Sequence, residues 1–242
     1  MKDTAYISTV NFDGLSSFTL DLDNKGSSLF YLPTFGLPDT IQNYLEQSLA
    51  LSAPPIFPAR HDDIHRQWFA LFPDRPLGWA GPHRWRNASW QLPGSDAVLR
   101  PVTMVRDCLE AAVGAVDGIG SITGRVHEEY NTVLVNRYEN GSSFIKWHAD
   151  DQPWYLSRGQ QDSVIGSVSL GAERWFELRS VEVPRKKVRI CLRSGSLIVM
   201  GGMTQTHWEH CLPRDPSCTS VRYNLTFRRV RTREENPERL ED

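Results

Sequence analysis

The sequence predicts an α+β domain in which helices precede a double-sheet jelly roll. Two observations carry this prediction: apolar residues recur at helical intervals in the first half, and short alternating apolar runs separated by turn residues follow Tyr130. Runs of this length and spacing are typical of a sandwich or barrel. They occupy residues 132–138, 143–148, 164–170, 174–180, 187–192, 196–200, 207–212 and 221–230. The 242 residues fit one domain, and the sequence contains no internal repeat.

Two helices are expected ahead of these strands. The first spans residues 38–51 and the second spans residues 101–116, while the first 35 or so residues look like short strands or irregular structure. A segment rich in Pro, Trp and Arg separates the helices. The face that the second helix would bury consists of Val102, Val105, Leu109, Ala112 and Val116.

Composition and charge exclude several classes of protein. The net charge of −2 gives no overall attraction to a polyanion, so nucleic-acid contact would depend on basic segments such as residues 184–189 and 227–233, which could equally be solvated strand or tail. No run approaches the roughly 18 apolar residues of a membrane span, and the N-terminus lacks the layout of a signal peptide. The four cysteines form no CxxC pair, so neither a zinc site nor a disulfide framework is expected. We therefore expect an intracellular protein of the nucleus or cytoplasm, with no membrane partner.

A candidate metal site begins at His148 and Asp150, which would project to the same face of one strand because side chains alternate. A third ligand could come from His207 or His210; their odd spacing would place them on opposite faces of a strand, so only one can contribute. Two histidines and one carboxylate on one side of a metal leave positions open, as in non-haem Fe(II) oxygenases. A second histidine pair, in HDDIH at residues 61–65, lacks the HExxH pattern of zinc hydrolases.

A candidate pocket for an acid lies on two of the expected strands. The strand from residue 221 to 228 alternates apolar residues with Arg222, Asn224, Thr226 and Arg228. Arginines pair bidentately with carboxylates, so this polar face suits a small dicarboxylate, although an edge strand with a wet face would show the same pattern. Asn136 and Tyr138 share a face of another strand, and inside a barrel they would need hydrogen-bond partners.

Four motifs occur in order: NRYENG, WHADD, HCLP and RYNLTFR. Together they resemble the AlkB family of nucleic-acid dealkylases, most densely between residues 131 and 229. The resemblance implies the double-stranded β-helix form of jelly roll, with Fe(II) as metal and 2-oxoglutarate as cosubstrate. It makes His148, Asp150 and His210 the iron ligands and places Asp151 near the substrate base. The residues that it assigns to 2-oxoglutarate are Asn136, Tyr138, Arg222, Asn224, Thr226 and Arg228.

The resemblance also implies a division of the chain. Residues 1–60 would form an N-terminal extension with a helix, residues 61–100 a nucleotide-recognition lid, residues 101–230 the catalytic core and residues 231–242 a charged tail. Within the lid, LGWAGPHRWRNASW contains Trp79 and Trp85, which we expect to contact the base. Tryptophans in this segment could instead pack the lid onto the barrel.

The function that the resemblance implies is oxidative demethylation of bases such as 1-methyladenine or 3-methylcytosine in DNA or RNA. The reaction would consume 2-oxoglutarate and O2, and we expect the protein to act as a monomer. Two alternatives stay open: an oxygenase of the same fold acting on a protein or small molecule, and a non-catalytic nucleic-acid-binding protein. The second is disfavoured because every expected iron and 2-oxoglutarate position is retained.

Overall fold

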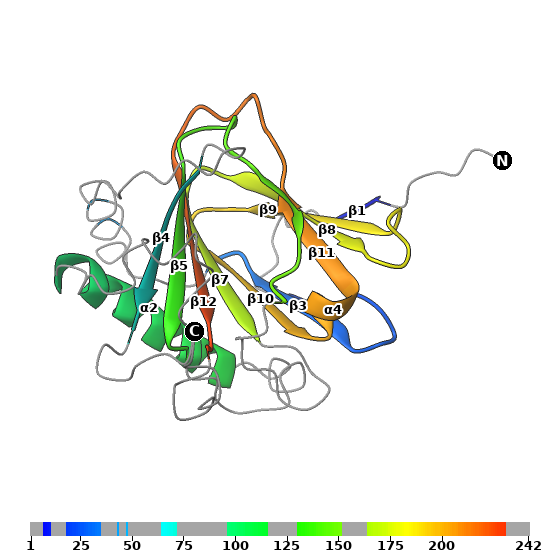
Figure 1. The fold of residues 1–242 in the computed structure, drawn as a ribbon, viewed down its shortest axis with the longest axis horizontal. Helices are drawn as coiled ribbons and strands as arrows, with labels where there is room; N and C mark the ends of the chain where they lie inside the picture. Colours follow the sequence, from blue (N-terminus) through cyan, green and yellow to red (C-terminus); the bar gives the residue numbers. More distant parts are fainter. Residues whose placement is uncertain are drawn as a thin grey trace, which may run out of the picture.

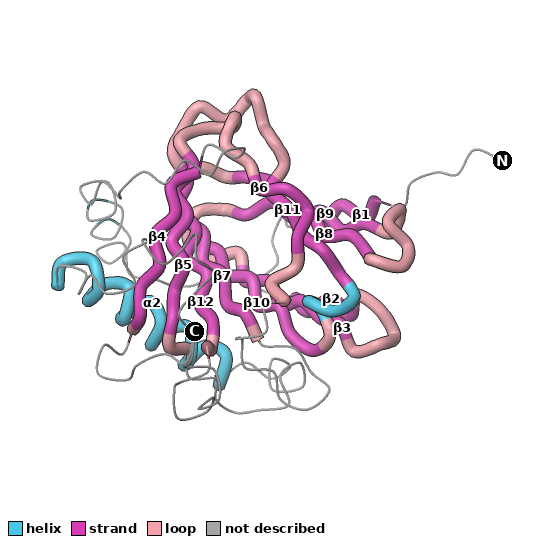
Figure 2. The backbone as a smooth tube through the Cα atoms, in the orientation of Figure 1, coloured by secondary structure: helices cyan, strands magenta, loops and turns pink. Residues whose placement is uncertain are grey.

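The computed structural model describes residues 7–10, 18–34, 43, 47, 64–71, 96–115, 130–151 and 164–230. Two β-sheets make up most of this part of the chain, and helix α2 (Asp96–Ala115) lies along the larger one (Figures 1 and 2). None of the helices in these ranges is long and apolar enough to cross a membrane. The arrangement confirms the predicted α+β class and its jelly roll.

The larger sheet has seven strands, and every neighbouring pair in it is antiparallel. Their spatial order is β2 (Phe18–Asp21), β3 (Ser27–Leu32), β10 (Ser196–Gly202), β7 (Ile165–Gly171), β12 (Arg222–Arg228), β5 (Thr132–Tyr138) and β4 (Ile64–Ala70). Strand β12 is paired on both sides, with β7 and with β5. The alternative of an edge strand with a wet face is therefore wrong.

The smaller sheet has five strands and carries the motifs at residues 145–150 and 208–212. Their spatial order is β1 (Ile7–Val10), β9 (Lys187–Leu192), β8 (Arg174–Ser180), β11 (Trp208–Leu212) and β6 (Ile145–His148). Strand β1 pairs with β9 in parallel, and the other pairs are antiparallel. Helix α4 (Thr204–His207) is a single turn between β10 and β11.

Helix α2 covers the outer face of the larger sheet. Its Val102, Val105 and Leu109 are fully buried in a core cluster with apolar residues of β5, β7, β10 and β12. The approach is close at Gly166 of β7, where a Cβ atom would lie 2.5 Å from a methyl carbon of Leu109. The predicted buried face of the helix is thus confirmed for the residues whose side chains are described.

The helix begins at Asp96, five residues earlier than the predicted start at Pro101. Proline favours the first turn of a helix because it lacks a backbone N–H, which suggested a start at that residue. Inside the helix Pro101 loses one backbone hydrogen bond, yet the turn before it remains helical. The expected helix at residues 38–51 lies almost entirely outside the described residues.

The space between the sheets is divided into an apolar part and a polar part. Beneath β3 and β10 it is filled by a second core cluster that includes Ile198, Met200, Leu178 and Trp208. Beneath β12 the inward side chains are polar and all buried. A hydrophobic core therefore supports one side of a buried polar region.

Each predicted run after Tyr130 overlaps one of the strands β5 to β12. Strand β4 was missed, because the charged residues around IHRQWFA hide its alternation; edge strands often carry such residues. Residues 64–70, which the sequence assigned to the lid segment, thus pair with β5 in the larger sheet.

We predict that Gly166→Ala destabilises the protein by about 1–3 kcal/mol, because the new methyl overpacks Leu109. Leu109→Ala should cost about 2–5 kcal/mol through the cavity it leaves. In the double variant the cost of Gly166→Ala should shrink, because the crowding leucine is gone. Urea unfolding of the four proteins measures this coupling; costs that add within about 0.5 kcal/mol would contradict the packing described.

Candidate metal centre

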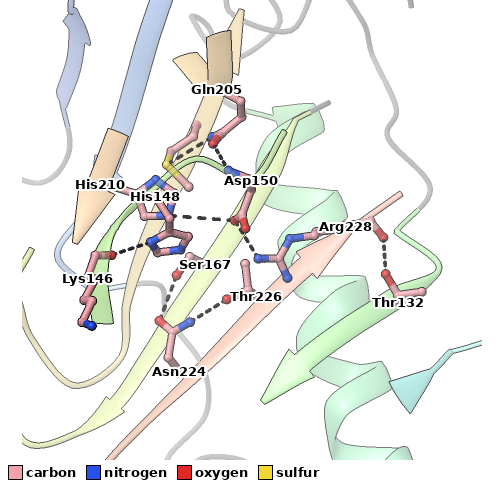
Figure 3. Close-up of polar contacts among 11 residues, drawn as sticks. Thr132, Lys146, His148, Asp150, Ser167, Gln205, His210, Asn224, Thr226 and Arg228 are labelled. Carbon is pink, nitrogen blue, oxygen red and sulfur yellow. Dashed lines mark hydrogen bonds and ion pairs between the residues drawn. The ribbon is translucent and has the colours of Figure 1, made fainter. Parts of the chain in front are cut away.

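Two histidines and an aspartate converge between the sheets (Figure 3). His148 ends β6, His210 lies in the middle of β11, and the two are direct partners in the antiparallel pairing of these strands. Their ring centroids are 4.3 Å apart. Together with Asp150 they offer one ligand atom each, and these atoms all lie within 4.8 Å of one another. The group has the composition expected of a non-haem Fe(II) site.

Strand alternation explains only part of this convergence. The prediction placed His148 and Asp150 on the same face of one strand. Strand β6 ends at His148, so Asp150 lies beyond the strand. His207 ends helix α4 rather than lying on β11, so the argument from opposite strand faces does not apply to it. The structure nevertheless brings His210, and not His207, beside His148 and Asp150.

The tautomer of His148 is fixed by a backbone contact. Its Nδ1 lies 2.8 Å from the carbonyl oxygen of Lys146. A carbonyl oxygen can only accept, so Nδ1 carries a proton and Nε2 is the ring nitrogen left to face a metal. The imidazole is therefore prepared to bind a metal through Nε2, as ligand histidines with such partners usually are.

Asp150 is held as a carboxylate by Arg228. Burial alone would raise the pKa of Asp150, but the combined effect of Arg228, His210 and His148, with Arg228 the largest of the three, outweighs burial and holds the pKa well below its usual range. The Nη2 atom of Arg228 donates to Oδ2 of Asp150 at 2.6 Å. The same oxygen lies 3.9 Å from Nε2 of His210.

His210 is neutral at physiological pH. Burial lowers the pKa of its imidazole to about 3, with His148 contributing in the same direction and Asp150 opposing. A neutral imidazole retains a lone pair for a metal. The protonation states of Asp150 and His210 are thus those that metal coordination requires.

Beside the metal centre, the polar residues of β12 form a buried hydrogen-bonded row. The Oδ1 atom of Asn224 accepts from Arg222 at 3.0 Å and from the hydroxyl of Ser167 at 2.9 Å. Its Nδ2 donates to Oγ1 of Thr226 at 2.6 Å. Across the ladder, Asn136 and Tyr138 of β5 pair with Asn224 and Arg222. The sequence-predicted pocket residues therefore lie on two adjacent strands.

Arg222 is buried at one end of this row, and Arg228 lies at the other end. Its Nη2 donates to Oγ of Ser169 at 2.9 Å, and its guanidinium carbon lies 5.0 Å from the ring centroid of Tyr138. Its Nε and Nη1 atoms, like Oδ1 of Asn136, find no hydrogen-bond partner among the described residues. Burial lowers the pKa of Arg222, but an arginine remains charged. A buried cation whose N–H groups have no acceptor destabilises the folded state unless an anion binds there.

Several residues at the site were missed by sequence reasoning. Ser167 and Ser169 share a strand face in IGSVSLG, a period-two signal that was available. The ring of Phe176 lies 5.4 Å from that of His210, and Gln205 accepts a hydrogen bond from the backbone of Asp150. Neither residue stands in a pattern that indicates such a role.

The predicted substrate contacts are described only in part. Asp151 directly follows Asp150 and is exposed to solvent. Trp79 and Trp85 lie outside the described residues, and so does most of the HDDIH segment. In the basic segment at 184–189, Lys186 donates to the carbonyl of Leu22 at 2.6 Å, and Arg189 lies over the ring of Trp175. This segment is at least partly structural.

Fold and site together define the class of protein. Residues 32–228 match the family model of the 2OG-Fe(II) oxygenase superfamily, and the chain belongs to this superfamily. Its members use Fe(II) and 2-oxoglutarate, in agreement with the donor set and the buried arginines.

The relatives of the chain confirm the resemblance to the AlkB family. Alpha-ketoglutarate-dependent dioxygenase alkB homolog 3 of Homo sapiens is 38% identical over 109 residues, covering 42% of this chain and 37% of that protein. DNA oxidative demethylase ALKBH2 of Homo sapiens is 39% identical over 121 residues, covering 47% and 44%. The chain thus spans less than half the length of these relatives. A solved structure described as that of OsALKBH1 aligns with 83% of this chain and 96% of its own, at 18% identity and a TM-score of 0.49.

We predict that His210→Ala weakens Co(II) binding by more than about 100-fold, because outer partners of metal ligands alone typically contribute 10–100-fold. His207→Ala should change the affinity less than about twofold, since its side chain is not part of the convergent group. Isothermal titration calorimetry with Co(II) compares the two. Equal losses in both variants would refute the geometry.

Proposed function

We propose that the chain is an Fe(II)- and 2-oxoglutarate-dependent dioxygenase that oxidatively removes alkyl groups from nucleic-acid bases. The observation that carries the proposal is the convergence of His148, Asp150 and His210 next to a buried row of polar groups, in which two nitrogens of Arg222 have no hydrogen-bond partner among the described residues. The superfamily match supports the use of Fe(II) and 2-oxoglutarate.

His148, Asp150 and His210 hold the iron. Two imidazoles and one carboxylate suit Fe(II), and three protein ligands leave positions for the cosubstrate and O2. Bound there with 2-oxoglutarate and O2, the iron supplies oxidation of an N-alkyl group, which leaves as an aldehyde while 2-oxoglutarate becomes succinate and CO2. Arg228 keeps Asp150 ionised, and the carbonyl of Lys146 keeps Nε2 of His148 directed to the metal.

Arg222 and Tyr138 bind the carboxylate of 2-oxoglutarate that is remote from the iron. Support comes from Nε and Nη1 of Arg222, which are buried and donate to nothing in the described part of the chain. Arg228 lies at the opposite end of β12, beside Asp150, and serves the iron end of the cosubstrate. Asn136, Asn224 and Thr226 line the pocket between the two ends, where polar groups replace water around the acid.

The nucleic-acid part of the proposal rests on the relatives, one of which is named a DNA oxidative demethylase. Asp151 is exposed beside Asp150 and would favour a cationic base such as 1-methyladenine or 3-methylcytosine over its neutral product. Trp79 and Trp85 are proposed to stack on the extruded base from a lid within residues 61–100. DNA and RNA both satisfy this chemistry.

We expect purified protein with Fe(II) and 2-oxoglutarate to restore oligonucleotides that carry 1-methyladenine or 3-methylcytosine, with formation of succinate. His148→Ala should abolish both products, because the metal loses a ligand. Mass spectrometry of the oligonucleotide and of succinate provides the readout. Succinate without repair would favour the same fold acting on a protein or small molecule. If iron-loaded protein forms neither product, the proposal that the chain is an enzyme is refuted.

A separate prediction concerns the cosubstrate. Arg222→Met should raise the KM for 2-oxoglutarate at least tenfold, since a hydrogen bond to a charged group contributes about 1.5–3 kcal/mol and each 1.4 kcal/mol is tenfold. Co(II) affinity should change little, because Arg222 lies at the end of the pocket away from the metal. Steady-state kinetics at saturating oligonucleotide measure KM; an unchanged value would remove Arg222 from the pocket.

A further inference from the structure

Asp150 lies outside the regular hydrogen bonding that positions the two histidines. His148 and His210 are fixed by the ladder between β6 and β11, whereas Asp150 follows two residues after β6 ends. Its backbone N–H donates not to a neighbouring strand but to Oε1 of Gln205, at 2.8 Å. Figure 3 shows Gln205 and Arg228 on opposite sides of Asp150. Asp150 therefore depends on side chains for its position.

The amide of Gln205 has one chemically sensible orientation. The side chain is buried, with 4% exposure, and its Nε2 lies 3.6 Å from the sulfur of Met200, a weak acceptor. Rotating the amide by 180° would place Nε2 against the N–H of Asp150, donor against donor. The observed orientation thus gives Asp150 an acceptor that is itself held in place.

Helix α4, which carries Gln205, is anchored to the hairpin of β2 and β3. The hydroxyl of Thr204 lies 2.9 Å from the carbonyl oxygen of Ser28 and accepts from the N–H of Ser28 at 3.1 Å. Gly202 precedes the helix with φ +65°, and a Cβ there would lie 1.8 Å from the carbonyl oxygen of Gly26. This close approach fixes the single turn against the rest of the fold.

We propose that Gln205 is a positioning residue for the metal centre: it holds the main chain of Asp150 so that the carboxylate meets His148 and His210. Arg228 restrains the carboxylate from β12, while Gln205 restrains the backbone from α4, which leads directly into the strand of His210. The inference rests on the proposed function of this site as a metal centre. Partners of this kind around ligand groups typically contribute 10–100-fold to metal affinity or activity.

The test compares variants that differ in the acceptor at position 205. Gln205→Met keeps the length of the side chain but replaces the amide oxygen with a thioether sulfur, a much weaker acceptor, and it should weaken Co(II) binding by about 10–100-fold and change the visible absorption spectrum of the bound Co(II). Gln205→Glu keeps an acceptor oxygen and should bind more tightly than Gln205→Met. Gln205→Asn withdraws the amide by one methylene and should also lose affinity, which supplies the test if Gln205→Met does not fold. His207→Gln, on the same turn of helix, is the matched control.

The outcomes separate this inference from the metal site itself. If wild type and His207→Gln bind Co(II) and Gln205→Met binds it with unchanged affinity and spectrum, the role of Gln205 is refuted and the metal site stands. If Gln205→Glu is as weak as Gln205→Met, the acceptor is not the cause and the inference is again refuted. If wild type binds no Co(II), both the metal centre and the inference fail. Thermal unfolding of each metal-free variant establishes that it is folded.

Discussion

The ion pair between Arg228 and Asp150 is the interaction on which the site depends, because it joins the two sheets where the metal ligands meet. Arg228 belongs to β12, an inner strand of the larger sheet, and Asp150 follows β6, an edge strand of the smaller one. Both side chains are nearly buried, so either charge left there without its partner would be costly; removing one partner of such a pair typically costs about 3–5 kcal/mol. The same pairing keeps Asp150 ionised, as a metal ligand must be.

The rest of the fold surrounds this pair with closely packed, buried side chains. On the outer face of the larger sheet, α2 packs so closely that Gly166 leaves no room for a side chain. Between the sheets, the apolar cluster around Ile198 and Met200 occupies one part, and the polar row of β12 occupies the other. Not every donor of the polar row has a partner, since Nε and Nη1 of Arg222 are buried without a hydrogen-bond acceptor among the described residues. A buried cation without its full set of hydrogen bonds destabilises the folded protein, and an anionic cosubstrate bound at that place would offset the loss.

Local patterns were sufficient to predict most of the β structure. The eight runs after Tyr130 are short apolar or alternating segments separated by turn residues, and each overlaps a strand. The misses have physical causes. Charged residues hide the alternation of β4 at the sheet edge, and Pro101 marked a false helix start because proline is tolerated inside this helix. At the site, the parity of Arg222 and Asn224 was visible in the sequence, whereas Gln205 belongs to a single helical turn that no periodicity identifies.

By itself the sequence determined which residue types the site would offer, and its ordered motifs indicated the family, because period-two alternation fixes which side chains share a strand face. Only the tertiary structure decided how residues far apart in the chain meet. The pairing of β11 with β6 brings His210 beside His148. Asp150 lies beyond the end of β6, where Arg228 of β12 donates a hydrogen bond to it. Strand order is set by packing across the whole fold, and a local pattern contains no information about it.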